Sequence, residues 1–288
     1  MSTRMVYRNI ASVGGASKRP GSYEFSAANL SSRSVGRDID PVIGIDHFHI
    51  RAPVFAPHPH AGFSAVTYLF EDGEGEFINR DSLGDRVVAH PGAVIWTVTG
   101  SGVLHEEYPA THGKLSHGLQ IFVNLPAAEK LQAPRLLFVD GPDVPVRELP
   151  GARVRVVTGN SGDVRGKLTA PGDITLLDVK LEPGAAFDES FPADHSVLAY
   201  VIKGSAFVGR EDRRLGALEA ASFAEGDGAI RLRASPSGAQ VVLLAGRPLR
   251  EPVVSYGPFV MNTEQQLAEA FEHYRAGGMG SLAPANGT

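Results

Sequence analysis

The sequence contains no cysteine among its 288 residues, and this absence excludes several kinds of chemistry. Without thiols there is no disulfide framework and no thiol nucleophile, so any metal must be held by histidine and carboxylate side chains. No run of about 20 apolar residues is present that could span a bilayer. The N-terminus up to Arg19 also lacks the apolar segment of a signal peptide. We therefore expect a cytoplasmic protein.

Positive charge is also scarce, since 27 Lys and Arg residues stand against 32 Asp and Glu residues, for a formal net charge of -5. Neither nucleic acid nor an anionic membrane is expected as a partner, because both favour a basic patch. The composition is otherwise that of an ordinary globular protein, with 43% hydrophobic and 20% charged residues. At roughly 100–200 residues per domain, the length suits one large or two medium domains.

Short strands separated by glycine and proline turns dominate the pattern. Residues 66–70 are β-branched and aromatic and lead into a glycine-rich turn, and residues 93–98, 103–108 and 119–125 form further short apolar runs. This spacing favours an antiparallel barrel or sandwich over alternating strand–helix units. A stretch rich in proline and charge, residues 132–152, is expected to connect two domains.

The second half of the sequence faintly repeats the first. Residues 197–202 followed by Gly204 resemble residues 66–70 followed by Gly73, and we interpret the repeat as a duplicated barrel. Around its first hairpin the second copy offers one histidine, His195, with no partner two residues on. One metal centre is therefore expected, in the N-terminal half.

The end of the chain changes its hydrophobic period. Thr263 and Gln266 fit a helix-capping pair, and apolar residues then recur at helical spacing up to Tyr274. The sequence predicts a helix at about residues 263–276 that packs on a barrel, followed by a mobile tail over residues 279–288.

Two short motifs carry candidate metal ligands. His58 and His60 are two residues apart, and so are His105 and Glu107. Side chains at i and i+2 of a strand share a face, so three imidazoles and one carboxylate converge if the two strands lie close together. That donor set suits a divalent first-row metal such as iron(II). Solvent-facing strand edges are the alternative, and Pro59 favours a strand start or a sheet edge, so spacing alone leaves both interpretations open.

Three further histidines have to be weighed. His47 and His49 form a second i, i+2 pair. We favour their interpretation as half-buried imidazoles near the site, with metal ligation as the alternative, because no acidic or histidine-bearing strand obviously pairs with them. His117 begins a strand, and we expect it to lie near the site and to support a ligand instead of binding the metal itself.

Several segments carry a specific resemblance. Residues 57–69 resemble the PHPHRGFETVTYL signature of the pirin family, which belongs to the cupin superfamily. Residues 96–107 are similar to that family's W-x-x-x-G-x-G-x-x-H-x-E segment, and residues 117–125 to its HGLQLWVNL strand. Residues 250–253 and 257–263 are similar to its REPV and GPFVMNT runs. These matches span most of the chain.

The resemblance implies an all-β fold of two cupin-type barrels, also described as double-stranded β-helices or jelly rolls, with a short C-terminal helix. Residues 1–132 would form a metal-binding cupin domain, and residues 133–288 a cupin domain without a metal site that ends in the helix. The metal implied is usually iron(II), and nickel, cobalt, manganese, copper and zinc are other candidates. The ligands it implies are His58, His60, His105 and Glu107.

Three departures from the family pattern matter. The family's Arg after the second histidine is Ala61 here, and its Glu after the Phe is Ser64. Residues 45–49, with the sequence Ile-Asp-His-Phe-His, replace a histidine-free segment. We expect these positions to lie beside the pocket, so that metal binding survives while substrate choice can differ.

Members of the family are similar to quercetin 2,3-dioxygenases, which open the flavonol heterocycle with O₂ and release carbon monoxide. The resemblance thus implies a small aromatic, flavonol-like substrate and O₂. Glu107 is the only anionic ligand of the set, and we expect it to be the base that takes the hydroxyl proton. Phe63, Trp96 and Phe122 are candidates to line an apolar pocket, with a plain core position as the alternative for each. A second, non-catalytic function is an iron-dependent regulator that binds a transcription factor or a metabolic enzyme. We favour the enzyme.

Overall fold

The computed structural model describes residues 5–36 and 39–285 and divides into two compact units. We call them the first unit and the second unit, and each is described by itself. As far as the chain is described, the first unit comprises Lys18–Asn29, Val42–Asp143 and Leu249–Thr288, and the second comprises Met1–Ser17, Leu30–Pro41 and Val144–Pro248.

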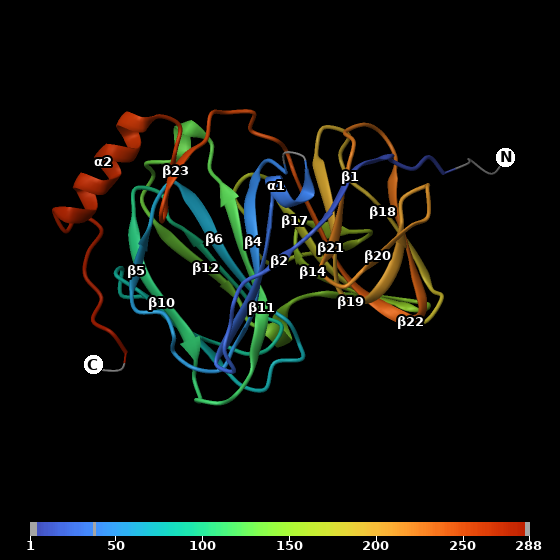
Figure 1. Ribbon diagram of the computed structural model, residues 1–288, viewed down its shortest axis with the longest axis horizontal. Helices are drawn as coiled ribbons and strands as arrows, with labels where there is room; N and C mark the ends of the chain where they lie inside the picture. The colour runs from blue at the N-terminus through green and yellow to red at the C-terminus, as the bar shows by residue number, and fades with distance from the viewer. Residues whose placement is uncertain (1–4, 37–38, 286–288) are drawn as a thin grey trace. The chain divides into compact units, whose positions relative to one another are not determined.

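Two antiparallel sheets form the first unit (Figure 1). The larger sheet has seven strands in the order β12-β9-β6-β11-β4-β3-β2, and the smaller has four in the order β5-β10-β7-β8. The strands of the larger sheet are β2 (Ser17–Lys18), β3 (Phe25–Ser31), β4 (Val42–Ile50), β6 (Phe63–Leu69), β9 (Val94–Val98), β11 (Ser116–Asn124) and β12 (Arg135–Val139). Those of the smaller sheet are β5 (His58–His60), β7 (Phe77–Asp81), β8 (Arg86–Ala89) and β10 (Val103–Pro109). Two 3₁₀ turns follow β11 and β12, namely η1 (Ala127–Glu129) and η2 (Gly141–Asp143).

Apolar side chains from both sheets meet inside the first unit. Phe48 and Ile50 of β4, Leu69 of β6 and Phe77 of β7 pack together and are almost fully buried. Full burial of such side chains contributes about 1.5–3 kcal/mol each. Because alternate residues of a strand point to opposite faces, the residues between them face the other side of the sheet.

The second unit is built on a nine-stranded antiparallel sheet. Seven strands run in the order β1-β21-β19-β22-β17-β14-β13, with β18 paired to β22 and β20 paired to β19. Their bounds are β1 (Ile10–Gly15), β13 (Val146–Leu149), β14 (Ala152–Thr158), β17 (Thr175–Leu181), β18 (Ala186–Ser190), β19 (Ser196–Val208), β20 (Arg213–Gly216), β21 (Glu219–Phe223) and β22 (Ala229–Gly246). A small ladder joins β15 (Asn160–Ser161) to β16 (Val164–Arg165), and α1 (Ser32–Val35) is a single helical turn.

This division differs from the predicted boundary between residues 132 and 133. Strand β1, near the N-terminus, pairs with β21 and so belongs to the second unit. Helix α2 (Glu264–Arg275) belongs to the first unit, where it contacts the hairpin of β23 (Val254–Tyr256) and β24 (Phe259–Met261). Pairing between segments distant in the sequence decides both placements, and local patterns do not reveal it.

Helix α2 begins where the sequence predicted. The hydroxyl of its N-cap Thr263 accepts a hydrogen bond from the Gln266 backbone N–H at 3.1 Å. The Gln266 side chain accepts from the N–H of Asn262 at 3.1 Å, one residue earlier than in a full capping box. No helix in residues 5–36 and 39–285 is long and apolar enough to span a membrane.

The segment after α2 is held against the first unit, so the prediction of a mobile tail is wrong for its described part. Met279 is 3% exposed and packs with α2 and β24 residues. Its carbonyl accepts a hydrogen bond from the Ser82 hydroxyl at 2.6 Å. Further along, the Ala285 N–H donates to Glu106 at 3.1 Å. Residues 286–288 lie outside the described residues.

Candidate metal centre

The register between β5 and β10 brings the histidines of the two motifs together. The strands are antiparallel, with His58 opposite His105 and His60 opposite Val103. His58 and His60 share one face of β5 because they are two residues apart. Ring nitrogens of His58, His60 and His105 all lie within 4.8 Å of one another.

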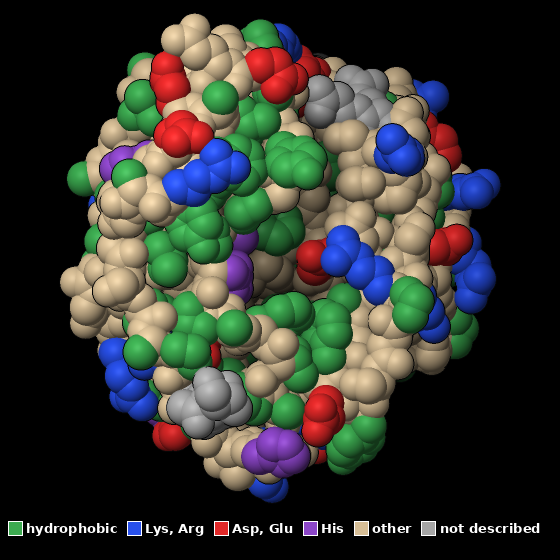
Figure 2. Space-filling model, turned by 60° about the vertical axis from the view of Figure 1, so that its left-hand side comes forward, with side chains coloured by type: hydrophobic (Ala, Val, Ile, Leu, Met, Phe, Trp, Pro, Cys, Tyr) green, Lys and Arg blue, Asp and Glu red, His purple; other side chains and the backbone are tan. Residues whose placement is uncertain are grey.

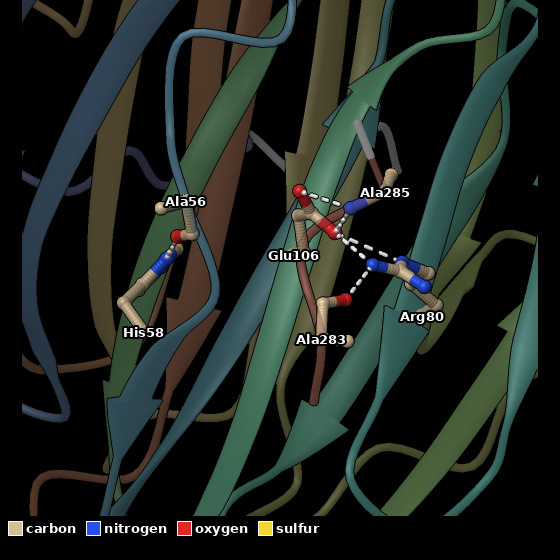
Figure 3. A network of polar contacts seen from close by, with 6 residues as sticks. All are labelled: Ala56, His58, Arg80, Glu106, Ala283 and Ala285. Atoms are coloured by element: carbon tan, nitrogen blue, oxygen red, sulfur yellow. Dashed lines mark hydrogen bonds and ion pairs between the residues drawn. The ribbon is translucent and has the colours of Figure 1, made fainter. Parts of the chain in front are cut away.

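Hydrogen bonding fixes the orientation of His58 (Figure 3). Its Nδ1 lies 2.9 Å from the carbonyl oxygen of Ala56. A carbonyl can only accept, so Nδ1 carries the proton and the Nε2 lone pair is free. That Nε2 lies 3.1 Å from Nε2 of His105. A histidine held through one nitrogen with its other nitrogen directed at a shared point is the usual arrangement of a metal ligand.

Burial keeps all three imidazoles neutral. Desolvation lowers the pKa of His60 to about 3, with a smaller contribution from the neighbouring His58. Desolvation and the two other imidazoles put the pKa of His105 well below its ordinary value. The pKa of His58 is also lowered by burial, and the hydrogen bond to Ala56 partly opposes this. Neutral imidazoles are the form that binds a metal.

Glu107 lines the same cavity as the three histidines. Burial raises the pKa of its carboxyl group to about 7, and a hydrogen bond from the Thr67 hydroxyl partly opposes the shift. Thr67 Oγ1 lies 2.6 Å from Glu107 Oε1 and 2.9 Å from the side-chain amide oxygen of Gln120. The hydroxyl has a single proton, so it donates to Glu107 when that group is ionised and to Gln120 when a protonated Glu107 donates to it.

The neighbouring carboxylate, Glu106, does not line the cavity and is hydrogen-bonded to Arg80 and Ala285 (Figure 3). It accepts hydrogen bonds from Arg80 Nε at 2.8 Å and Nη2 at 2.6 Å. The Ala285 N–H also donates to it, and Arg80 donates to the carbonyl of Ala283. Glu106 therefore fastens the C-terminal segment to β10, and Glu107 is the carboxylate available at the site.

The cavity has a volume of about 170 Å³ and is predominantly apolar. Figure 2 shows a hollow with histidine inside it and hydrophobic side chains gathered around it. Asp46 and Gln120 add polar groups beside the histidines and Glu107. The apolar wall consists of Phe25, Phe48, Ile50, Phe55, Phe77 and Phe122.

One of the three aromatic residues predicted for a pocket lines this cavity, namely Phe122. Phe63 packs edge-on against His60, at 5.2 Å between ring centroids, and against Phe122 at 5.6 Å, without lining the cavity itself. Trp96 is 1% exposed in β9 and belongs to the core. For Phe63 and Trp96 the structure corresponds to the alternative of core positions.

The departures from the family pattern lie at different distances from the cavity. Ala61 and Ser64 are fully buried and do not line it. Asp46 and Phe48, from the segment that replaces a histidine-free one, do line it. Sequence reasoning placed residues 45–49 beside the pocket but did not identify which of them line it, although the alternation of Asp46, Phe48 and Ile50 along one strand was a usable signal. It also missed the support that Thr67 gives to Glu107.

His117 lies elsewhere than expected. Its strand neighbours Gln120 and Phe122 face the cavity, whereas His117 contacts His47 and His49 on the opposite face of the seven-stranded sheet. Desolvation, then repulsion from the neighbouring imidazoles, lowers the pKa of His47 to about 3. The pKa of the more exposed His49 is lowered in the same direction. Within the described residues these three histidines form a second cluster whose ring nitrogens lie within 4.8 Å.

Comparison with known proteins agrees with this architecture. Residues 24–123 match the Pirin family and residues 176–280 match the Pirin C-terminal cupin domain. Human Pirin is 34% identical over 250 residues, covering 84% of this chain and 85% of that protein. A Pirin-like protein of Solanum lycopersicum is 32% identical over 251 residues, covering 85% of each chain.

A crystal structure of quercetin 2,3-dioxygenase from Acinetobacter baumannii superimposes with a TM-score of 0.85 at 28% identity. The superposition covers 95% of this chain and 99% of that one. The predicted all-β fold with two cupin-type domains is thereby confirmed. The chain belongs to the pirin family.

Proposed function

We propose that this protein is a metal-dependent dioxygenase that opens flavonols such as quercetin with O₂ and releases carbon monoxide. The observation that carries the proposal is the set of three converging, neutral imidazoles and a carboxylate on the wall of an aromatic-lined cavity. The likeness over nearly the whole chain to a solved quercetin 2,3-dioxygenase supports it.

Three of the four predicted ligands, His58, His60 and His105, converge as a divalent metal requires, and Glu107 lines the cavity beside them. His58, His60 and His105 would supply three imidazole nitrogens and Glu107 a carboxylate oxygen, a donor set without thiolate that suits iron(II). We propose iron, with nickel, cobalt, manganese, copper and zinc as the other outcomes of metal analysis. When bound, the ion would supply Lewis acidity toward the substrate hydroxyl and a common point of attachment for the reactants.

Glu107 is the proposed base. In the metal-free protein the pKa of its carboxyl group is raised to about 7. A bound cation would favour the ionised carboxylate, which is the form that accepts a proton. On taking the flavonol hydroxyl proton at its oxygen, protonated Glu107 would donate to Thr67, whose own proton then turns to Gln120. The Thr67 hydroxyl thus keeps a hydrogen bond to Glu107 in both protonation states of the carboxyl group.

The aromatic wall would orient the substrate and exclude water. Ligand cavities commonly span about 300–1,000 Å³. The volume of about 170 Å³ is smaller, so we propose that the ring bearing the reactive hydroxyl enters the cavity and the rest of the flavonol stays at its mouth. Phe48 and Phe122 are the aromatic side chains proposed to contact that ring.

The test is metal analysis of anaerobically purified protein, followed by O₂ uptake and carbon monoxide release with quercetin. We expect about one iron per chain at His58, His60 and His105. We also expect that Glu107→Gln abolishes turnover. Glu106→Gln is the matched control, since the same chemical change falls on the other face of β10. Turnover by Glu107→Gln with metal still bound would reject the base role. Bound metal without uptake would favour the alternative, an iron-dependent regulator that binds a transcription factor or metabolic enzyme.

A further inference from the structure

The second histidine cluster lies on the face of the seven-stranded sheet that turns away from the cavity. In β4, Asp46 and Phe48 line the cavity, so His47 and His49 point to the other side. Strand β11 runs antiparallel beside β4 with His117 opposite His49. The sheet itself therefore separates this cluster from His58, His60 and His105, and the two sets cannot share one ion.

A hydrogen bond at Nδ1 orients the ring of His117, as another does for His58. Its Nδ1 lies 2.7 Å from a carboxylate oxygen of Asp72. A carboxylate accepts, so Nδ1 carries a proton and Nε2 is the nitrogen directed away from Asp72. That Nε2 lies 2.7 Å from Nε2 of His47. A carboxylate behind a histidine whose other nitrogen meets a second imidazole is the common outer arrangement of a metal site.

Two of the three histidines in this cluster are held by burial, and the third is free to rotate at the surface. His47 and His117 are 5% and 7% exposed, whereas His49 is exposed to solvent. The His49 ring stacks on that of His117 with centroids 4.2 Å apart and 11° between the planes. At a Zn–N distance of about 2.0–2.1 Å, tetrahedral ligand nitrogens lie roughly 3.3 Å apart. The Nε2 atoms of His47 and His117, 2.7 Å apart, would have to separate slightly, and the exposed His49 would rotate to bring its nitrogen to that spacing.

We propose that His47, His49 and His117 form a second metal site, for zinc(II), with Asp72 positioning His117 from behind. Three imidazoles with an open fourth position are a common zinc ligand set. The bound ion would join three segments of the first unit. His47 and His49 come from β4, His117 comes from β11, and Asp72 comes from the turn after β6. The site does not depend on the proposed oxygenase reaction.

The experiment uses full-length protein in which His58→Ala and His60→Ala disable the cluster in the cavity, which we call the barrel site. After removal of metal with a chelator, zinc binding is measured by equilibrium dialysis, and cobalt(II) absorption reports the ligand geometry. We expect this variant to bind about one zinc per chain with a tetrahedral cobalt spectrum. Adding His49→Ala should weaken binding by roughly 100-fold or more, and adding Asp72→Asn by about 10–100-fold.

The matched control is His112→Ala, which removes another exposed histidine, 72% exposed in its side chain, outside the cluster. It should leave zinc affinity unchanged. The proposal is overturned if the barrel-disabled protein binds no zinc while its circular dichroism remains that of the parent. It is equally overturned if His49→Ala and His112→Ala give the same affinity. Either result leaves the barrel site untouched, so its function is judged separately.

Discussion

Replacing Glu107 with Gln should stabilise the metal-free protein at neutral and alkaline pH. The half-buried carboxyl group lies in the cavity beside three imidazoles, and desolvation raises its pKa from 4.5 to about 7. In the unfolded chain the same group ionises near its ordinary value, so between those two pKa values the folded state binds more protons than the unfolded state. Folding stability contributed by this group therefore falls as pH rises through that window.

The size of the effect follows from the shift. One pKa unit corresponds to about 1.4 kcal/mol. The shift therefore lowers the free energy of unfolding of the wild-type protein by on the order of 3 kcal/mol above pH 7, relative to its value near pH 4.5. Glutamine has nearly the same shape and does not ionise, so Glu107→Gln avoids this cost at every pH. The buried histidines shift in the opposite sense and destabilise the fold in acid, but they do so equally in both proteins.

The assay is urea unfolding with a chelator present, at about pH 5 and about pH 8, for wild type, Glu107→Gln and the exposed-site control Glu129→Gln. The stability advantage of Glu107→Gln should grow by about 2–3 kcal/mol between the two pH values. Added metal should remove that advantage, because a cation favours the ionised carboxylate. An advantage that stays constant with pH would refute the reasoning, since it would show that Glu107 ionises normally in the fold.

Three further predictions concern the cavity and the first unit. Phe122→Ala should raise the KM for a flavonol about 10-fold or more while metal content stays unchanged, since it removes one aromatic wall; unchanged KM would place the substrate elsewhere. Arg80→Ala should cost about 2 kcal/mol in urea unfolding and speed proteolysis of the C-terminal segment, because the buried carboxylate beside it loses its cation. Gly62→Ala should cost about 3 kcal/mol or prevent folding, because an added Cβ would meet the carbonyl of Val260 at a residue with φ of +86°. Gly84→Ala, with φ of +94° and open space, isolates the backbone strain, and equal losses in the two variants would contradict a steric role for Val260.

The cluster of His58, His60 and His105 could be anticipated because it depends on local periodicity. Two i, i+2 motifs determine which side chains share a face, and one register between β5 and β10 then brings them together. The position of His117 could have been argued from the same rule. It lies an odd number of residues from Phe122, so the two side chains of one regular strand face opposite sides, and both could not be near the cavity.

The unit boundaries and the site of helix packing could not be anticipated in this way. The capping pair at Thr263 specifies where α2 begins, but nothing local indicates which barrel receives its apolar face. The pairing of β1 with β21 joins segments about 200 residues apart. Such choices depend on the total burial that each arrangement achieves, and a strand pattern of period two is compatible with more than one partner.

Strand β4 links the two sites of the first unit, because its two faces serve different purposes. Asp46 and Phe48 face the cavity, whereas His47 and His49 face the second cluster. All four lie within residues 45–49. A slip of one residue in the pairing of β4 would exchange the two faces and place imidazoles where the aromatic wall now stands. The register with β11 therefore has to be specified closely. The packing of Phe48 in the core penalises such a slip, since it would bring this large apolar side chain out of the interior.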